Sequence, residues 1–242
     1  TGKVWAGTFW GGLICLNGAN TTIYKNKPGD SNSLANNNVW ALAEDTEGNI
    51  WIGTLGGGLQ KLDTKTGSFT TFNQIRNGLA NDYVSSLCFG KGNTLLIGTA
   101  AGLSVMDMTT KKLVTYTRCK KGNVPFSNLN VNQVYEDSRG LIWIATRDGL
   151  NIYDIRTDKL VILNKAQGLA NSVACGITED KSKNMWITTD GGVSNIIVET
   201  TSQPGEYTFR PYNYDEMDGL QSREFNLRSI MTARDGSIIM GG

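Results

Sequence analysis

The stretch Gly48-Asn49-Ile50-Trp51-Ile52-Gly53-Thr54 decides the fold, because it returns along the chain with little change. Further copies lie at residues 2–8, 93–99, 140–146, 184–189 and 236–242. The positions that correspond to Trp51 are separated by 43 to 53 residues. Self-similarity at such a period is the signature of a repeat architecture, in which each repeat is one supersecondary unit.

Each repeat continues in the same way after this stretch. A glycine-rich turn precedes a short strand such as 59–63, and a polar turn precedes an aromatic-rich strand such as 68–72. A loop with Leu and Asn, such as 78–82, then leads into an apolar strand such as 84–89. Four short strands at a period of about 45 residues, without helical periodicity, predict a four-stranded β-propeller blade. We label its strands A to D, A being the strand after the loop and B the strand with Trp.

The sequence therefore predicts an all-β chain of β-propeller blades, each of four antiparallel strands. The blades are expected at residues 1–24 (partial), 39–72, 84–116, 131–163, 174–212 and 225–242 (partial). These are about five blade-equivalents. The chain opens and closes on strand B, so we expect residues 1–242 to form a single propeller domain that is an incomplete part of a larger, seven-bladed propeller. The recurring Trp is expected in the core between blades, since a blade must bury its faces on its neighbours.

Composition argues against several functions. The 242 residues include no histidine, which removes the commonest general base and the commonest metal ligand. The formal net charge of +1 argues against a nucleic-acid surface, and no apolar run is long enough to span a membrane. The four cysteines are too far apart in sequence for a zinc knuckle. We therefore expect no catalysis, no metal site, no cofactor and no nucleic-acid partner in this segment.

The quoted repeats resemble the two-component regulator propeller family over essentially the whole chain. The resemblance rests on Gly-x-Ile-Trp-Ile-Gly-Thr, the Gly-Gly-Leu turn and the Gly-Leu-x-Asn loop, and residues 218–226 are similar to the closing segment of the family's second propeller. It implies the periplasmic sensor region of an inner-membrane hybrid histidine kinase that regulates glycan utilisation. It further implies oligosaccharide recognition, a homodimer, and remaining blades and an immunoglobulin-like domain in the same chain. Leu96 in place of Trp, and Ala145 and Thr188 in place of Gly, depart from the core pattern.

The alternation of strand directions places the candidate site. The B-to-C turns and the D-to-A loops must lie on one face of the blades, which we term the loop face. Aromatic rings, amides, carboxylates and arginine are the groups that bind sugars, and the loops on this face contain that mixture. The expected ligand-binding residues are Trp10, Tyr83, Arg147, Asp148, Asp190 and Arg223.

Several of these residues have a plainer interpretation. Trp10 could equally be buried against a missing blade, and Arg147-Asp148 could be a local turn. Asn81 and Asn171 are typical of caps that begin a strand. The pairs that look like catalytic carboxylates recur at the A-to-B turn, so they are interpreted as turn formers: Glu44-Asp45, Glu136-Asp137 and Glu179-Asp180.

The sequence leaves three functions open. The first is carbohydrate sensing, which the resemblance implies. The second is a scaffold for protein–protein interaction. The third is an enzyme, because streptogramin lyases are propellers with a similar repeated phrase, but their chemistry uses a histidine base that this sequence lacks.

Overall fold

Antiparallel sheets contain about half of the residues of the structure, a computed structural model that describes residues 2–203 and 205–242. The first sheet has three strands, the next four sheets have four strands each, and the last has two. In every sheet the strands follow one another in chain order, as they do in a propeller blade. The all-β fold, the four-stranded blade and the number of blade-equivalents are thereby confirmed.

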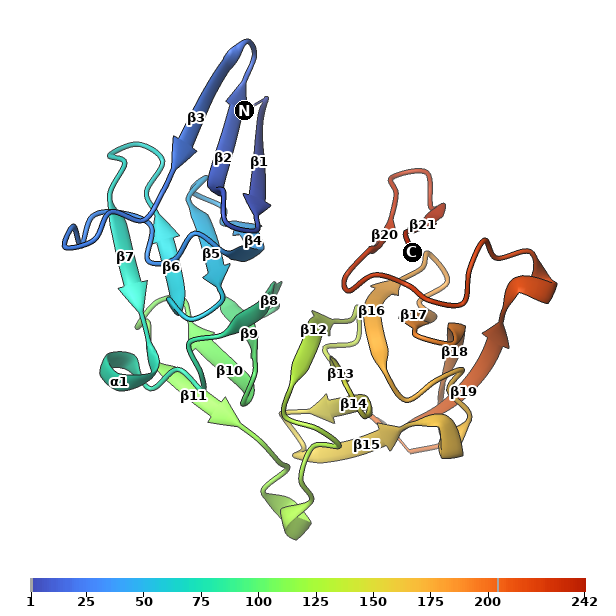
Figure 1. Cartoon of the computed structure of the whole chain (residues 1–242). Coiled ribbons are helices and arrows are strands. Elements are labelled where there is room, and N and C mark those ends of the chain that lie inside the picture. Colours follow the sequence, from blue (N-terminus) through green and yellow to red (C-terminus); the bar gives the residue numbers. More distant parts are fainter. Residues whose placement is uncertain (1, 204) are drawn as a thin grey trace. The chain divides into compact units, whose positions relative to one another are not determined.

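The chain divides into two compact units, residues 1–116 and 117–242. One propeller domain over all 242 residues stays a prediction. The first unit contains three sheets (Figure 1): β1 (Lys3–Thr8), β2 (Gly12–Asn17), β3 (Asn20–Tyr24); β4 (Val39–Glu44), β5 (Ile50–Thr54), β6 (Leu59–Leu62), β7 (Phe69–Phe72); β8 (Val84–Gly90), β9 (Thr94–Thr99), β10 (Gly102–Asp107), β11 (Leu113–Tyr116). A one-turn helix, α1 (Gln74–Asn77), joins β7 to β8.

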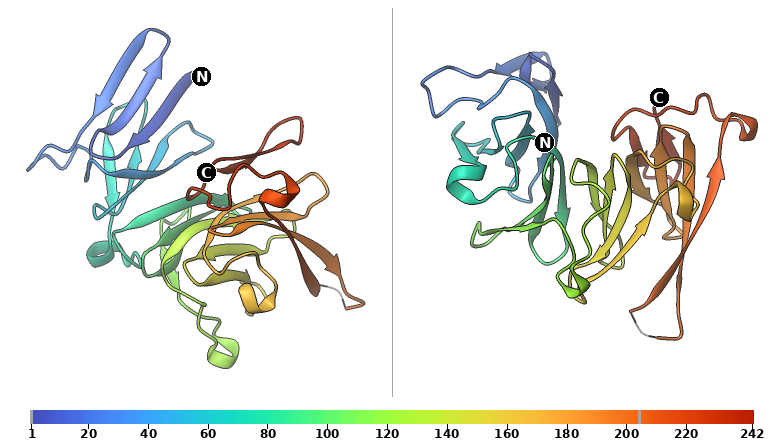
Figure 2. Two further views of the ribbon diagram at one scale, coloured as in Figure 1. Left: turned by 45° about the vertical axis from the view of Figure 1, so that its right-hand side comes forward. Right: turned by 60° about the horizontal axis from the view of Figure 1, so that its bottom comes forward.

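The second unit contains the remaining sheets: β12 (Val131–Glu136), β13 (Ile142–Thr146), β14 (Gly149–Asp154), β15 (Lys159–Leu163); β16 (Ala174–Glu179), β17 (Met185–Thr189), β18 (Gly192–Thr200), β19 (Tyr207–Tyr214); β20 (Ile230–Thr232), β21 (Ile238–Met240). Short 3-10 turns lie at Lys121–Asn123, Lys165–Gln167 and Glu216–Asp218. Within each unit, successive sheets lie side by side through their A and B strands. The β18–β19 hairpin has strands of nine and eight residues and reaches farther than the others (Figure 2).

Two of the recurring Trp residues lie in the core between blades, as the sequence predicts, whereas Trp5 and Trp186 are half-buried. Trp51 and Trp143 are both completely buried. Trp51 belongs to a cluster with Val84 and Leu95 of the following blade, and Trp143 to one with Ile177 of its following blade. Each Trp therefore fills the space between two neighbouring sheets, which neither sheet could cover alone.

A hydrogen bond from each of three Trp side chains explains the Asp of the A-to-B turn. The indole N–H donates to an Asp Oδ2 six residues earlier at 3.0 Å in the pairs Trp51–Asp45, Trp143–Asp137 and Trp186–Asp180. The same Asp side chains accept backbone N–H groups of their own turns. Their interpretation as turn formers is confirmed, and they also satisfy a donor that is costly to leave unpaired.

Blades that lack the Trp also lack the Asp that would accept its hydrogen bond. Leu96 stands where the other blades have Trp, and the position six residues earlier is Gly90 rather than Asp. In the last sheet, Ile239 and Ala233 replace the Trp and the Asp together. A Leu or Ile side chain has no polar hydrogen and needs no acceptor. The departure at Leu96 is therefore a matched change of two residues.

The Asp45–Trp51 bond should make the first unit sensitive to acid. Burial by itself raises the pKa of Asp45, but the hydrogen bonds from Trp51, Asn49 and Glu47 outweigh it and bring the pKa below its usual value. A lowered pKa means that the carboxylate stabilises the fold above about pH 4, and that this contribution is lost as the pH falls through the lowered pKa. Between pH 7 and pH 3, the melting temperature of the parent should fall more steeply than that of Asp45→Asn. An equal fall in both proteins would show that the Asp45 carboxylate does not contribute to stability in this way.

The Gly of the repeated phrase is required by the next blade. A Cβ on Gly53 would lie 2.6 Å from Val84 Cγ1 and 3.0 Å from the Cβ of Ala41. Where Ala145 takes the place of this Gly, the next blade begins with Ala174 instead of Val, and both lie in one buried cluster. A larger residue on one blade is thus matched by a smaller one on its neighbour.

Thr188 is accommodated in a related way. Its hydroxyl oxygen lies 2.7 Å from the point where Gly176, on the paired strand β16, would carry a Cβ. The corresponding position in the blade of Gly53 is Ala41. The two substitutions of this Gly that the sequence shows are therefore compensated by small residues beside them.

We expect Gly53→Ala to destabilise the first unit by about 1–3 kcal/mol, because the added methyl overpacks the contact with Val84. The double variant Gly53→Ala/Val84→Ala should lose less than the sum of the two single variants, since the smaller side chain removes the overlap. Urea unfolding of the parent, both single variants and the double variant measures this coupling. Strict additivity would show that the overlap is not what excludes a side chain at this position.

Candidate ligand-binding face

The B-to-C turns and the D-to-A loops meet within each unit, as the alternation of strands predicts. In the first unit, the backbone N–H of Gly56 in a B-to-C turn donates to the carbonyl of Asp82 in the next D-to-A loop at 3.0 Å. In the second, the N–H of Gly149 donates to the carbonyl of Ser172 in the same way. The loop face is therefore a continuous backbone framework in each unit.

Buried polar side chains on the C strands hold the D-to-A loops in place. Each accepts a backbone N–H from the loop that precedes its blade: Ala35 to Gln60 at 2.7 Å, Ala80 to Ser104 at 3.0 Å, Ser127 to Asn151 at 2.8 Å and Ala170 to Ser194 at 3.0 Å. The four acceptors are at most 1% exposed. Such bonds rigidify the loops that present the candidate site.

The Asn residues of these loops are caps, as their positions indicate. The side-chain oxygens of Asn81 and Asn171 accept the N–H groups of Tyr83 and Val173, two residues further on. Asn36 and Asn128 make the same bond in their own loops. These amide oxygens are used locally.

A β-bulge at the start of each complete A strand adds a residue that the sequence analysis missed. The pairing register shifts there, which leaves one residue extra in the bulged strand: Trp40, Ser85, Asn132 and Cys175. Bulges re-aim side chains and are common beside functional sites. The sequence does show that this position differs in every blade, although the residue before it is Val in three of the four.

One cavity of about 500 Å³ opens on the loop face of the second unit. Its described lining residues are Asn132, Arg147, Val173, Asp190, Phe225, Asn226 and Leu227. They come from a bulge, from two consecutive B-to-C turns and from two D-to-A loops. The volume is within the roughly 300–1,000 Å³ of small-molecule sites, and apolar walls with a few polar groups are typical of them. The structure thus brings the predicted residues Arg147 and Asp190 together.

The polar groups of this cavity differ in how they are held. Asp190 is exposed, and its Oδ1 accepts the Sγ–H of the buried Cys175 at 3.1 Å. Burial, and then the bond to Asp190, raise the pKa of the Cys175 thiol, so it stays protonated and remains a donor. Arg147 is also exposed, and no ion pair of the described residues involves it.

Two predicted residues of this unit lie outside the cavity lining. Asp148 is exposed beside Arg147, and its backbone N–H donates to Thr146 Oγ1 at 3.3 Å. Arg223 belongs to the expected loop, but its guanidinium lies 3.2 Å from Glu216 and 3.7 Å from Asp215. The side chain of Arg223 is therefore engaged with the turn after β19.

The remaining two predicted residues lie in the first unit. Trp10 is 70% exposed. The ring of Phe9 packs edge to face against two Trp rings, with centroid distances of 6.4 Å to the bulge residue Trp40 and 5.3 Å to Trp10. The φ of +68° at Trp10 is unusual for a residue with a side chain, and its N–H is held by Asn38 Oδ1 at 2.9 Å. Tyr83 is 54% exposed, and it lies against a different B-to-C turn. Both predicted residues of the first unit are therefore exposed aromatic side chains, at two different turns.

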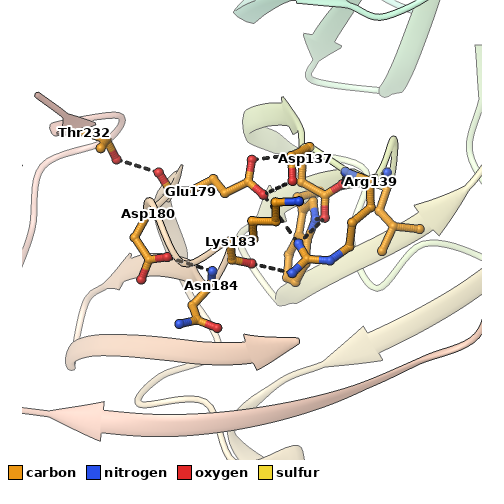
Figure 3. A network of polar contacts seen from close by, with 10 residues as sticks. Asp137, Arg139, Glu179, Asp180, Lys183, Asn184 and Thr232 are labelled. Atoms are coloured by element: carbon orange, nitrogen blue, oxygen red, sulfur yellow. Dashed lines mark hydrogen bonds and ion pairs between the residues drawn. The ribbon is translucent and has the colours of Figure 1, made fainter. Parts of the chain in front are cut away.

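On the opposite face of the second unit, an ion-pair network of Arg139, Asp137 and Glu179, here termed the clamp, links neighbouring blades (Figure 3). The Arg139 guanidinium lies 3.3 Å from Asp137 and 3.4 Å from Glu179 of the next blade, and it also donates to the Lys183 carbonyl at 2.6 Å. Thr232 of the last sheet donates to the Glu179 carbonyl at 2.7 Å. Three successive blades are joined here, so Glu179 has a structural partner. Within residues 2–203 and 205–242, no three His, Cys, Asp or Glu side chains gather as a metal site would need.

Known proteins with propeller repeats have sequences similar to that of this chain. The two-component regulator propeller model matches residues 33–56 and 125–148. Histidine kinase P4 of Formosa agariphila is 28% identical over 248 residues, which cover 99% of this chain and 17% of that protein. This chain thus spans about one sixth of the length of that relative.

Solved structures share the fold at low identity. The extracellular domain assigned to the hybrid two-component system BT3049 of B. thetaiotaomicron has a TM-score of 0.74 and 23% identity, over 99% of this chain and 30% of that one. A catalytically inactive histidine-to-alanine virginiamycin B lyase of Staphylococcus aureus, with quinupristin, has a TM-score of 0.60 and 12% identity, over 94% of this chain and 76% of that one. No described helix here has the length and apolarity to cross a membrane. The family's model thus matches two segments of this chain that contain the recurring phrase, at residues 48–54 and 140–146.

Proposed function

We propose that this chain is part of the extracytoplasmic sensor region of a hybrid two-component histidine kinase, and that its loop face takes part in recognising oligosaccharides. The observation that carries the proposal is the cavity on the loop face of the second unit, which joins Arg147 and Asp190 to apolar walls. The family match and the sensor relatives support the sensor role. In the complete protein we place this region in the periplasm, in a homodimer, with an immunoglobulin-like domain after it that passes the signal to the membrane.

The chemistry of both units suits a sugar ligand. Arginine donates, a carboxylate accepts, and an amide does both, which matches hydroxyls that donate and accept. The exposed ring of Trp10 offers an amphipathic face of the kind that stacks on sugar rings. A rigid backbone framework under the cavity reduces the entropy lost on binding.

Two other functions have weaker support. A lyase shares the fold, but the lyase named above is inactive once a histidine is replaced, and this sequence has no histidine. A protein-binding scaffold is favoured by the apolar residues exposed on the first sheet, Val4, Leu16 and Ile23. These residues belong to the first unit and the loop-face cavity belongs to the second, so the two functions can be tested with different variants of one protein.

The proposal is tested by calorimetry of the complete extracytoplasmic region against a panel of neutral and acidic oligosaccharides. Arg147→Ala should weaken the binding of a recognised oligosaccharide at least tenfold. Arg76→Ala, an equal change of charge at an exposed position of α1, is the control and should bind like the parent. If no oligosaccharide binds, the proposed recognition is wrong; if Arg147→Ala binds unchanged, its location is wrong.

A further inference from the structure

We infer that the loop-face cavity of the second unit selects an uncharged saccharide with adjacent hydroxyls, and that it discriminates against uronates and sulfated sugars. The inference rests on the proposed function and specifies its ligand class. It follows from the charges of the two residues that the cavity brings together, Arg147 and Asp190.

Arg147 and Asp190 offer complementary and open hydrogen-bonding groups. A guanidinium only donates and a carboxylate only accepts, whereas a hydroxyl does both. The two residues line one cavity, yet they form no ion pair with each other among the described residues. One sugar hydroxyl can therefore accept from Arg147 while its neighbour donates to Asp190. Charge-assisted bonds of this kind are the strong ones.

The Asp190 carboxylate is fixed as an acceptor before any ligand arrives. Cys175 occupies one lone-pair site on Oδ1, and the backbone N–H of Asp190 is bonded to the Val173 carbonyl at 3.3 Å. Several lone-pair sites of the carboxylate remain for a ligand. Cys175 is only 1% exposed, so it acts on Asp190 from behind the surface and not on the ligand. It is a positioning residue.

The same arrangement works against an acidic sugar. A carboxylate or sulfate would be attracted to Arg147, but the cavity would also hold it close to the negative Asp190. The two effects oppose each other, while an uncharged hydroxyl pair uses both residues. Specificity of this type comes from a repulsive group as much as from an attractive one. The amides of Asn132 and Asn226 and the apolar Leu227 add no charge to the lining.

Matched sugars test the inference in the complete extracytoplasmic region. The probes are oligosaccharides of equal length and linkage that differ only at C6, galactose against galacturonate and glucose against glucuronate. Calorimetry should show at least tenfold tighter binding of a neutral member than of its acidic partner. Asp190→Asn should weaken the neutral sugar at least tenfold and bring the ratio between the pair below threefold, because it removes both the strong acceptor and the repulsion. Cys175→Ala should weaken the neutral sugar less than Asp190→Asn, and Cys175→Ser should restore binding.

The control is Glu224→Gln, which removes the same charge at an exposed position outside the lining and should leave the ratio unchanged. An acidic member that binds the parent as tightly as its neutral partner would overturn the inference and leave the proposed function standing. An unchanged ratio in Asp190→Asn would overturn the role of that carboxylate. If neither class binds, the proposed function itself fails.

Discussion

Trp143→Ala should lower the free energy of unfolding of the second unit by about 3–5 kcal/mol, the usual cost of removing a large buried aromatic side chain. Trp143 is completely buried, lies between two blades and meets Phe209 edge to face at 5.6 Å. Its removal would leave a cavity and would take from Asp137 the indole N–H that it accepts. Denaturant unfolding followed by far-ultraviolet circular dichroism measures the loss.

Trp186→Ala is the matched control for this result. Trp186 makes the same bond to the Asp of its own turn, but it is only half-buried and stacks on Tyr214 at 5.7 Å. Trp186→Ala should therefore lower the free energy of unfolding clearly less than Trp143→Ala does. Equal losses would mean that the indole–Asp bond, and not packing between blades, carries the stabilisation.

Arg139→Ala should destabilise the second unit by about 3–5 kcal/mol, because it leaves two carboxylates without their cation. The side chains of Asp137 and Glu179 are 0% and 11% exposed, and Arg139 is 13% exposed, so water cannot fully replace the guanidinium. The carbonyl of Lys183 also loses its donor. Chemical unfolding, compared at pH 7 between variant and parent, gives the difference.

The contrast is Arg210→Ala in the same unit. Arg210 pairs with Glu199 at 3.0 Å, but the two side chains are 63% and 47% exposed. Exposed pairs contribute about 0–1 kcal/mol, so this variant should unfold almost like the parent. If both Arg variants lost the same small amount, the network in Figure 3 would be a surface contact and not a clamp.

The repeat predicted the blades because it is a local pattern that recurs. Each phrase such as residues 48–54 contains the apolar strand, the Trp and the Gly at fixed offsets, so strand order and core follow from it. An Asp stands six residues before Trp51, Trp143 and Trp186, but the hydrogen bond between the two side chains required the fold. Matched changes such as Leu96 with Gly90 explain the departures from the repeat.

The lining of the candidate site could be predicted only in part from the sequence. Arg147 and Asp190 stand at variable turn positions, which reasoning from strand alternation can locate. The bulge residue Asn132 could not be placed, because one extra residue in a strand turns a side chain to a direction that alternation does not predict. Arg223 was assigned to the correct loop, but nothing in the sequence indicated that acidic residues after β19 would hold its guanidinium.

The most direct test of ligand recognition is a crystal structure of the extracytoplasmic region with the tightest-binding oligosaccharide of the panel. We expect a sugar ring in the cavity of the second unit, with one hydroxyl within hydrogen-bond distance of the Arg147 guanidinium and the adjacent hydroxyl within that distance of the Asp190 carboxylate. A saccharide bound elsewhere, with this cavity holding only solvent, would contradict it.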